Sequence, residues 1–420
     1  VGVADGRGAR ARAAGCDAQE LAHYSPRRAG DRARPCAAGA RLALPADCKE
    51  GMDAYMGRVV RRGIGLLLAV CLVCSPAGAA EPPAAAPASD AASATALGEA
   101  PILAVGPIEY RPGRGLHLGP TGLTIGGFTN VKAEYSDESH GEFSLDLLNV
   151  FLIFDKIPHF RAVAELQLKD ILTASKESVG TADFAFDVRR LFGDVTVTEE
   201  LRIRAGIFLT PVGYWNLILA PPLTWTTEIP LIVEETFFQE TTTGVMVYGA
   251  AQLGPGYLNY AAFSQFLQPL SDDPDLDPPD NTAGARLVYD SGPAWSAGLT
   301  FQAAEKTSRW TQLGAVHAIW QPRRGEVLAE FYAQGGEGLP STQWGTYLQG
   351  VLEVREPFYL VGRYEYYDPP GAAAPINLFL AGAVAKPFPF MAVKVEYRYA
   401  DRSLDGDDLG GVFASFSTFF

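Results

Sequence analysis

Charged side chains of opposite sign are concentrated in two parts of this sequence. The segment Thr210–Glu240 contains no Lys or Arg, and its charges are Glu228, Glu234, Glu235 and Glu240. A second set is basic and occupies the polar positions of alternating segments: Lys132, Arg161, Lys169, Arg202, Arg204, Arg286, Arg363, Lys394 and Arg398. Acids facing bases across a narrow space would impose a transverse field on passing ions. The alternative is that both sets form ion pairs that merely fill a polar interior.

The acidic segment is also rich in apolar and aromatic residues, which include Tyr214, Trp215 and Trp225. So much apolar surface must be buried against a wall or a partner. The three aromatic side chains are candidates to line the same narrow space, either packing structurally or stacking on sugar rings. Because no regularly spaced row of aromatic residues follows, the sequence favours packing.

Catalytic patterns are missing after residue 80. The histidines there are His117, His140, His159 and His317, and no Gly-x-Ser-x-Gly elbow or His-Glu-x-x-His pair accompanies them. The acidic run Ser271–Asp277 lacks the glycine of a calcium-binding loop. We therefore expect neither an enzyme nor a bound metal or cofactor.

The elements that carry these residues show period-two alternation. In Phe160–Lys169, Glu326–Gln334 and Ala392–Tyr399, apolar residues alternate with charged or polar ones. Such alternation predicts strands with one apolar and one polar face. Sixteen candidate strands cover residues 123–135, 142–154, 160–169, 183–197, 201–209, 241–250, 257–267, 282–290, 295–305, 310–320, 326–334, 344–354, 358–367, 376–386, 391–399 and 412–420.

The connections between these strands alternate in length. Every second one is short, as at Thr198–Glu200 and Arg355–Pro357, whereas most of the others are longer, with the short Lys306–Arg309 as an exception. An even number of strands with short and long connections in turn is typical of transmembrane barrels. The sequence therefore predicts an all-β, antiparallel transmembrane barrel of about 16 strands over residues 105–420.

The residues before the barrel read as export and processing sequence. Met56 is followed by arginines, the apolar run Ile64–Cys74 and small residues up to Ala80, which is typical of a secretory signal peptide over 56–80. We expect residues 1–55 to be non-native upstream translation, although a genuine basic extension is the alternative. Residues 81–104 are Pro/Ala-rich and are expected to form a disordered linker.

Cysteine and charge usage narrow the class further. All five cysteines precede Ala80, so a disulfide scaffold is excluded for the remainder. Residues 81–420 contain 22 basic and 41 acidic residues, a formal charge of −19, which argues against nucleic acid as a partner.

Within Leu201–Gly249 the sequence resembles the phosphate-selective porin superfamily. The resemblance is carried by Arg204–Phe208, by Thr210–Gly213 and by Thr243–Gly249. It implies a sixteen-stranded channel that is often a homotrimer, with the long third loop folded inward. A Lys that this family commonly places before the Pro-x-Gly exit is absent here, so phosphate selectivity is not implied.

These observations together favour a water-filled pore in the bacterial outer membrane, narrowed by the loop 210–240. Phe420 ends an amphipathic final strand and resembles the signal that barrel-assembly machinery recognises. Membrane lipid is the other expected partner. A non-conducting structural or adhesive barrel is the alternative. Anion or cation preference stays open at this point, because the acidic balance and the wall arginines point in opposite directions.

Overall fold

The computed structural model describes residues 103–136, 141–175, 179–180, 185–235, 238–268, 278–337, 339, 341–371, 374–404 and 409–420. The expected upstream segment, signal peptide and most of the expected linker lie outside the described residues, as do His140 and the run Ser271–Asp277. Leu103 and Ala104 belong to strand β1 (Leu103–Val105), so regular structure is present two residues before the expected barrel boundary.

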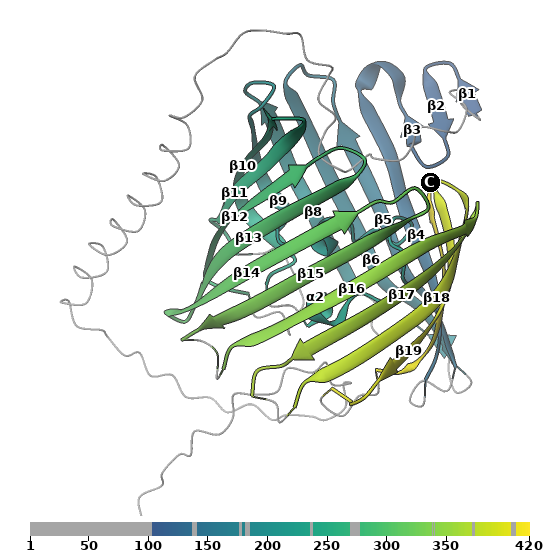
Figure 1. Cartoon of the computed structure of the whole chain (residues 1–420). Coiled ribbons are helices and arrows are strands. Elements are labelled where there is room, and N and C mark those ends of the chain that lie inside the picture. Colours follow the sequence, from purple (N-terminus) through teal and green to yellow (C-terminus); the bar gives the residue numbers. More distant parts are fainter. Residues whose placement is uncertain are drawn as a thin grey trace, which may run out of the picture. The chain divides into compact units, whose positions relative to one another are not determined.

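Sixteen antiparallel strands form a closed barrel, which confirms the predicted fold class (Figure 1). They are β4 (Leu123–Tyr135), β5 (Glu142–Phe154), β6 (Phe160–Ser175), β8 (Ala185–Thr196), β9 (Arg202–Leu209), β10 (Thr241–Leu253), β11 (Gly256–Gln265), β12 (Asn281–Asp290), β13 (Trp295–Lys306), β14 (Arg309–Trp320), β15 (Gly325–Gly336), β16 (Gln343–Arg355), β17 (Phe358–Asp368), β18 (Ile376–Phe388), β19 (Met391–Ala400) and β20 (Gly411–Phe419). β20 pairs with β4 from Val412 opposite Tyr135 to Phe419 opposite Phe128. This pairing closes the sheet, so the barrel has no free edge.

The two faces of the barrel follow the alternation in the sequence. On β19, Lys394, Glu396 and Arg398 point inward and are at most 4% exposed. Val395 and Tyr397 between them point outward and are 50% and 55% exposed. An apolar outer face and a polar inner face suit a barrel that has lipid outside and water inside.

The connections divide the barrel into two ends. At the turn end, strands are joined by short segments such as 254–255, 356–357 and 389–390. Most connections at the loop end are longer. The predicted exception, at Lys306–Arg309, is a hairpin with a two-residue turn. Its central residues, Thr307 and Ser308, have φ values of +49° and +63°, as a type I′ turn requires. β6 extends to Ser175, six residues beyond its expected end, which shortens the connection that follows.

Three short strands extend the sheet at the turn end. β3 (Gly115–His117) pairs with the start of β4, β2 (Ile108–Arg111) pairs with β3, and β1 pairs with β2. They lie beside the C-terminus, where the backbone of Phe420 exchanges hydrogen bonds with that of Gly127 (Figure 1). A two-residue strand, β7 (Val179–Gly180), pairs with the loop end of β6.

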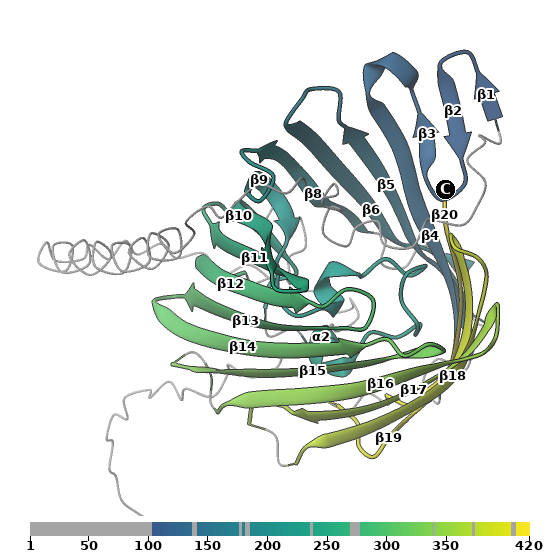
Figure 2. The same ribbon diagram turned by 45° about the horizontal axis from the view of Figure 1, so that its top comes forward.

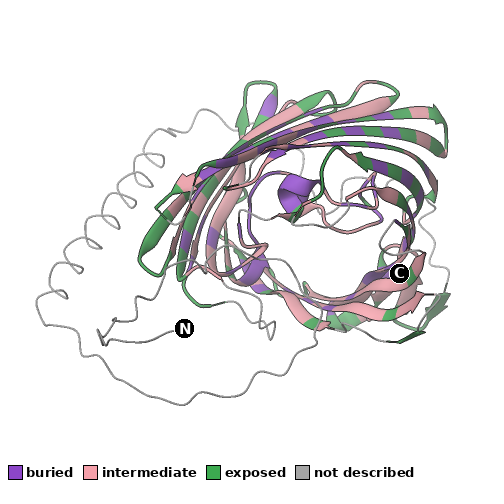
Figure 3. Cartoon of the chain, turned by 90° about the horizontal axis from the view of Figure 1, so that it is seen from below, coloured by how far each residue is buried: buried purple, intermediate pink, exposed green. Residues whose placement is uncertain are grey.

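The longest connection, Thr210–Glu240, lies inside the ring of strands (Figures 2 and 3). It contains a 3-10 turn at Trp215–Leu217 and the single-turn helix α2 (Leu231–Glu234), which packs against β16 and β17. Within the part of the chain that the structure describes, no helix is long and apolar enough to cross a membrane.

Candidate functional site

The loop Thr210–Glu240 packs against the inward faces of β14–β19, here named the loop-side wall. Its apolar side chains form a buried cluster with those of the wall. The loop contributes Val212, Trp215, Leu231, Ile232, Val233 and Phe238, and the wall contributes Leu313, Ala315, Ile319, Leu328, Tyr332, Tyr347, Tyr367 and Ile376. Burial of this surface explains why an apolar loop lies inside a polar barrel.

Glu330 of β15 binds the start of the loop through its main chain. The backbone N–H groups of Tyr214 and Trp215 donate to its two carboxylate oxygens, at 2.6 and 3.3 Å. The hydroxyl groups of Tyr332 and Tyr347 donate to the same carboxylate. A single buried acid therefore accepts four hydrogen bonds and fixes the loop where it leaves β9.

Charged side chains of β17 and β19 hold the rest of the loop in the same manner. Arg363 donates to the Thr226 hydroxyl and to two loop carbonyl oxygens. Lys394 donates to the Thr224 hydroxyl and to two further carbonyl oxygens, at 2.7 to 2.9 Å. Glu396 accepts the backbone N–H groups of Thr227 and Glu228. These contacts satisfy main-chain groups that would otherwise be buried without partners.

Two glycines allow the loop to approach this wall closely. Gly213 has a φ of +61°, and a Cβ there would collide with the Tyr332 hydroxyl. A Cβ at Gly345 of β16 would come within 2.8 Å of the Ile232 side chain. Because glycine has no Cβ, neither position causes a collision where the loop and the wall touch.

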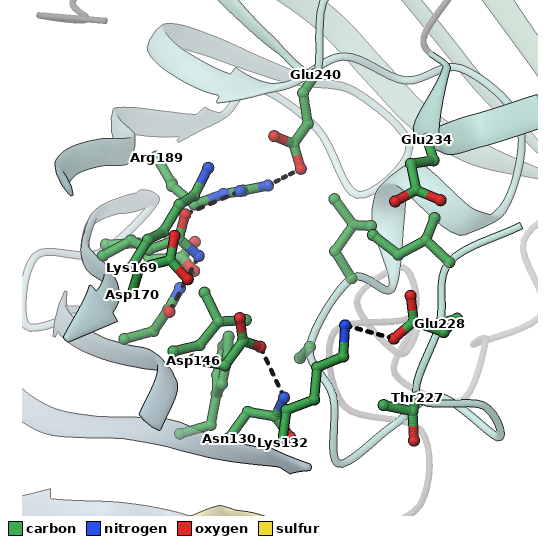
Figure 4. A pocket seen from close by; sticks show the side chains of 18 of the residues that line it. Asn130, Lys132, Asp146, Lys169, Asp170, Arg189, Thr227, Glu228, Glu234 and Glu240 are labelled. Atoms are coloured by element: carbon green, nitrogen blue, oxygen red, sulfur yellow. Dashed lines mark hydrogen bonds and ion pairs between the residues drawn. The ribbon is translucent and has the colours of Figure 1, made fainter. Parts of the chain in front are cut away.

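The opposite side of the loop faces an open space of about 330 Å³, here named the aperture (Figure 4). Its other boundary is formed by the inward faces of β4, β5, β6 and β8, named the pore-side wall. The wall contributes Asn130, Lys132, Asp146, Asn149, Glu165, Gln167, Lys169, Asp170, Arg189 and Arg190 among others. The loop contributes Leu219, Ala220, Thr227, Glu228, Ile229, Glu234 and Glu240.

Two ion pairs cross from the pore-side wall to the loop, at two sides of the aperture (Figure 4). Lys132 Nζ lies 2.8 Å from Glu228 Oε1, and Arg189 pairs with Glu240. Arg398 of the loop-side wall also contacts Glu228, at 3.0 Å. The loop is therefore attached to both walls, and the aperture has fixed boundaries.

Three neighbouring strands of the pore-side wall carry β-bulges at the level of the aperture. The pairing register skips Asp146 in β5, Asp170 and Ile171 in β6, and Arg189 in β8. A bulge interrupts strict alternation and re-aims side chains. Three pairs of consecutive residues consequently line the aperture: Asp146 with Leu147, Lys169 with Asp170, and Arg189 with Arg190.

Hydrogen bonds connect the polar groups of this wall. Arg189 donates to Gln167, which donates to Asn149, which in turn donates to Glu165, at 3.0, 3.1 and 2.5 Å. Arg190 Nε lies 2.8 Å from Glu165 Oε2. Because each of these side chains is held by a neighbour, the wall presents its charges in a fixed arrangement.

The carboxylates of the loop differ in their proton affinity. Burial alone would raise the pKa of Glu228, but Lys132 and Arg398 hold that pKa below its usual range. Burial likewise opposes ionisation of Glu240, yet Arg189 keeps its pKa low. Glu234 is enclosed by the barrel, and this enclosure together with Glu228 raises its pKa to about 7. Its side chain borders the aperture and is exposed.

The same barrel occurs in outer-membrane porins of known structure. An anion-selective porin from Comamonas acidovorans has a TM-score of 0.52 at 14% identity, over 71% of this chain and 99% of that chain. OmpF of Salmonella typhi in complex with daunomycin has a TM-score of 0.51 at 10% identity, over 71% of this chain and 97% of that chain. The trimer form of OmpT, an outer membrane protein of Vibrio cholerae, has a TM-score of 0.50 at 11% identity, over 71% of this chain and 99% of that chain. No protein-family model and no curated protein matches the sequence. At these identities the likeness shows the fold alone, and that fold is the porin barrel.

The structure separates the predicted site residues into three groups. Lys132, Lys169, Glu228 and Glu234 line the aperture. Arg286, Arg363, Lys394 and Arg398 lie against the loop, where Arg286 donates to the Gly213 carbonyl and the others make the contacts described above. Arg161, Arg202 and Arg204 lie on β6 and β9 outside the aperture lining, and Arg204 pairs with Asp194 at 2.8 Å and stacks on Phe192.

The loop aromatics and Glu235 also differ from the expected pore lining. Trp215 is 2% exposed inside the cluster with the loop-side wall. Trp225 donates from its indole nitrogen to Glu326 and packs on Tyr359, with ring centroids 5.0 Å apart. Tyr214 packs beside His317, and Glu235 is half-buried at the end of α2. These positions suit packing, because the rings face the wall.

Sequence reasoning missed most of the pore-side wall. Asp146, Asp170, Arg189 and Arg190 line the aperture, but strict alternation assigns only one residue of each consecutive pair to the interior. The doublet Arg189-Arg190 within a predicted strand was the available signal, since two adjacent charges cannot both point inward without a bulge. Among the described residues, no group of His, Cys, Asp and Glu is arranged to hold a metal ion.

Proposed function

We propose that this protein is a porin of the bacterial outer membrane that passes small hydrophilic solutes and ions by diffusion. The observation that carries the proposal is the aperture: a polar, charge-lined space between the loop Thr210–Glu240 and the pore-side wall. A barrel of this size is otherwise wide enough for an aqueous channel. The loop therefore sets the effective cross-section of the pore.

The arrangement of charged groups on the walls favours the passage of solutes over catalysis. Charges of the pore-side wall are held in ion pairs and hydrogen bonds, as in Arg190 with Glu165. Fixed charges of this kind select among solutes without forming covalent intermediates. We accordingly propose a channel and not an enzyme, with no cofactor.

Assembly and subtype are part of the same proposal. A homotrimer is supported by the trimer form of the Vibrio cholerae OmpT structure with the same fold. Recognition of Phe420 by barrel-assembly machinery is supported by its place at the end of β20, beside Gly127 of β4. Membership of the phosphate-selective porin superfamily rests on the resemblance of Leu201–Gly249 and on the shared barrel. The exposed outer faces of the strands would contact membrane lipid.

Planar-bilayer recording of the purified protein tests the channel. Stepwise increases in current are expected, and deletion of residues 217–235 should raise the single-channel conductance severalfold because the loop no longer narrows the lumen. The deleted protein must still show the altered electrophoretic mobility of a folded barrel before heating. If the folded wild-type protein gives no current, the alternative of a structural or adhesive barrel replaces the channel.

A further inference from the structure

Acidic residues outnumber basic residues in the lining of the aperture. Its lining contains six carboxylates, namely Asp146, Glu165, Asp170, Glu228, Glu234 and Glu240. The bases in the same lining are Lys132, Lys169, Arg189 and Arg190, so the formal charge is −2 when every group is ionised and −1 when Glu234 is protonated. Next to the lining, Arg398 contacts Glu228 and adds one positive charge, whereas Asp187, 3.6 Å from Lys169, and Glu134, 3.5 Å from Lys132, add two negative charges.

The charges that hold the loop do not offset this excess. The carboxylates that hold the loop are Glu330, Glu365 and Glu396, and the bases that hold it are Arg286, Arg363 and Lys394. These six groups sum to zero; five lie on the loop-side wall, and Arg286 lies on β12. Charges on the outer connections are further away, and salt screens interactions beyond about 8 Å.

Two of the six carboxylates, Asp146 and Asp170, lie at bulges, and a third bulge turns Arg189 inward. Asp146 and Asp170 both face the aperture from the pore-side wall (Figure 4). Asp146 accepts a hydrogen bond from Asn130 at 2.8 Å, which fixes its carboxylate. Asp170 has a φ of +48°, a conformation that Asp and Asn tolerate better than most residues. Without these two carboxylates the lining would be formally neutral.

We propose that the aperture prefers cations and that Asp146 and Asp170 are the residues that set this preference. The inference rests on the proposed channel function and names the class of solute that the channel favours: small inorganic or organic cations. It runs against the anion preference that the wall arginines suggested in the sequence.

The test is the reversal potential of the purified protein in a planar bilayer under a KCl gradient. The wild-type protein should be more permeable to K⁺ than to Cl⁻. In the D146N/D170N variant the permeability ratio should approach one, with each substitution lowering it by about two- to fivefold, because a unit charge about 4 Å from an ion in water shifts the ion's free energy by about 1 kcal/mol. Both replacements keep the side-chain shape and an acceptor oxygen, so the fold should be retained.

Two matched variants control for effects unrelated to the aperture. D155N removes one carboxylate from an exposed turn outside the aperture and should leave the permeability ratio unchanged. K169Q removes a base from the lining and should increase the preference for K⁺. A conducting wild-type protein that prefers Cl⁻, or a D146N/D170N variant with the wild-type ratio, overturns the cation inference and leaves the channel intact. A folded protein without any conductance overturns both.

Discussion

The pore-side wall and the loop-side wall are built from the same kinds of residue but use them differently. Both place Lys, Arg, Asp and Glu on the inner face of the barrel. On the pore-side wall these groups contact one another or cross to the loop, and they border the aperture. On the loop-side wall, Glu330, Arg363 and Lys394 contact the main chain of the loop and are at most 3% exposed.

This difference shows that the role of an inward-facing charge in a barrel can be assigned only when the group opposite it is known. Lys394 on β19 and Lys169 on β6 would be equivalent by alternation alone. Lys394 is 1% exposed because the loop covers it, whereas the side chain of Lys169 is 36% exposed to the lumen. The loop thus converts one wall into a structural support and leaves the other to interact with solutes.

Removal of the Glu330 carboxylate should produce the largest effect, because four donors share it. In E330A the Tyr214 and Trp215 N–H groups and two tyrosine hydroxyls lose their acceptor. Each buried donor left unsatisfied costs about 1–3 kcal/mol, so a loss of at least about 3 kcal/mol in the free energy of unfolding is expected. Urea titration of the folded barrel in lipid vesicles measures this change, and bilayer recordings should show larger and noisier currents.

The matched control on the other wall is D146N. This substitution should change the free energy of unfolding by no more than about 0.5 kcal/mol, because the aspartate borders water and its isostere keeps the contact with Asn130. E330Q retains one acceptor oxygen and should fall between E330A and the wild-type protein. Equal destabilisation by E330A and D146N would refute the division of the interior into a supporting wall and a solute-facing wall.

An intermediate effect is expected where the loop and the pore-side wall meet. Lys132 and Glu228 form an ion pair at 2.8 Å, with side chains that are 24% and 11% exposed. A double-mutant cycle with K132M and E228Q should give a coupling energy of about 1 kcal/mol, since the pair is partly screened by lumen water. Arg398 also contacts Glu228, so the K132M single variant retains part of the attachment. A coupling energy near zero would mean that this pair does not hold the loop in place.

Much of the barrel could be predicted because its pattern is local. The period-two alternation within β19 is sufficient to assign Lys394, Glu396 and Arg398 to the inner face, and each predicted strand ends close to a turn residue. Outward Val395 and Tyr397 follow from the same period. The closed sixteen-strand sheet needed only this pattern and the lengths of the connections.

The aperture could not be predicted in the same way, for two physical reasons. The bulges at Asp146 and Arg189 change the side-chain parity within a strand, and nothing in the local alternation fixes where they occur. The path of the loop depends on packing between residues far apart in the sequence. The Ile232 side chain packs against Gly345 of β16, which is more than a hundred residues away. Which wall is covered therefore depends on complementary surfaces far apart in the sequence.

The smallest expected effect concerns Glu234, the loop carboxylate that is exposed to the aperture. Glu228, Glu235, Lys132 and Arg398 surround it, and enclosure together with Glu228 raises its pKa to about 7. Below its pKa the group is neutral, and above it the aperture gains one negative charge, so the preference for K⁺ should increase as the pH rises. The midpoint of this change should therefore lie near pH 7, within the range from pH 5 to pH 8. Glu228 and Glu240 have lowered pKa values and stay ionised over most of this range. The K⁺/Cl⁻ permeability ratio should change by about twofold between pH 5 and pH 8, since an exposed charge is well screened. E234Q should lack this step, and an identical pH profile in both proteins would exclude Glu234 as its source.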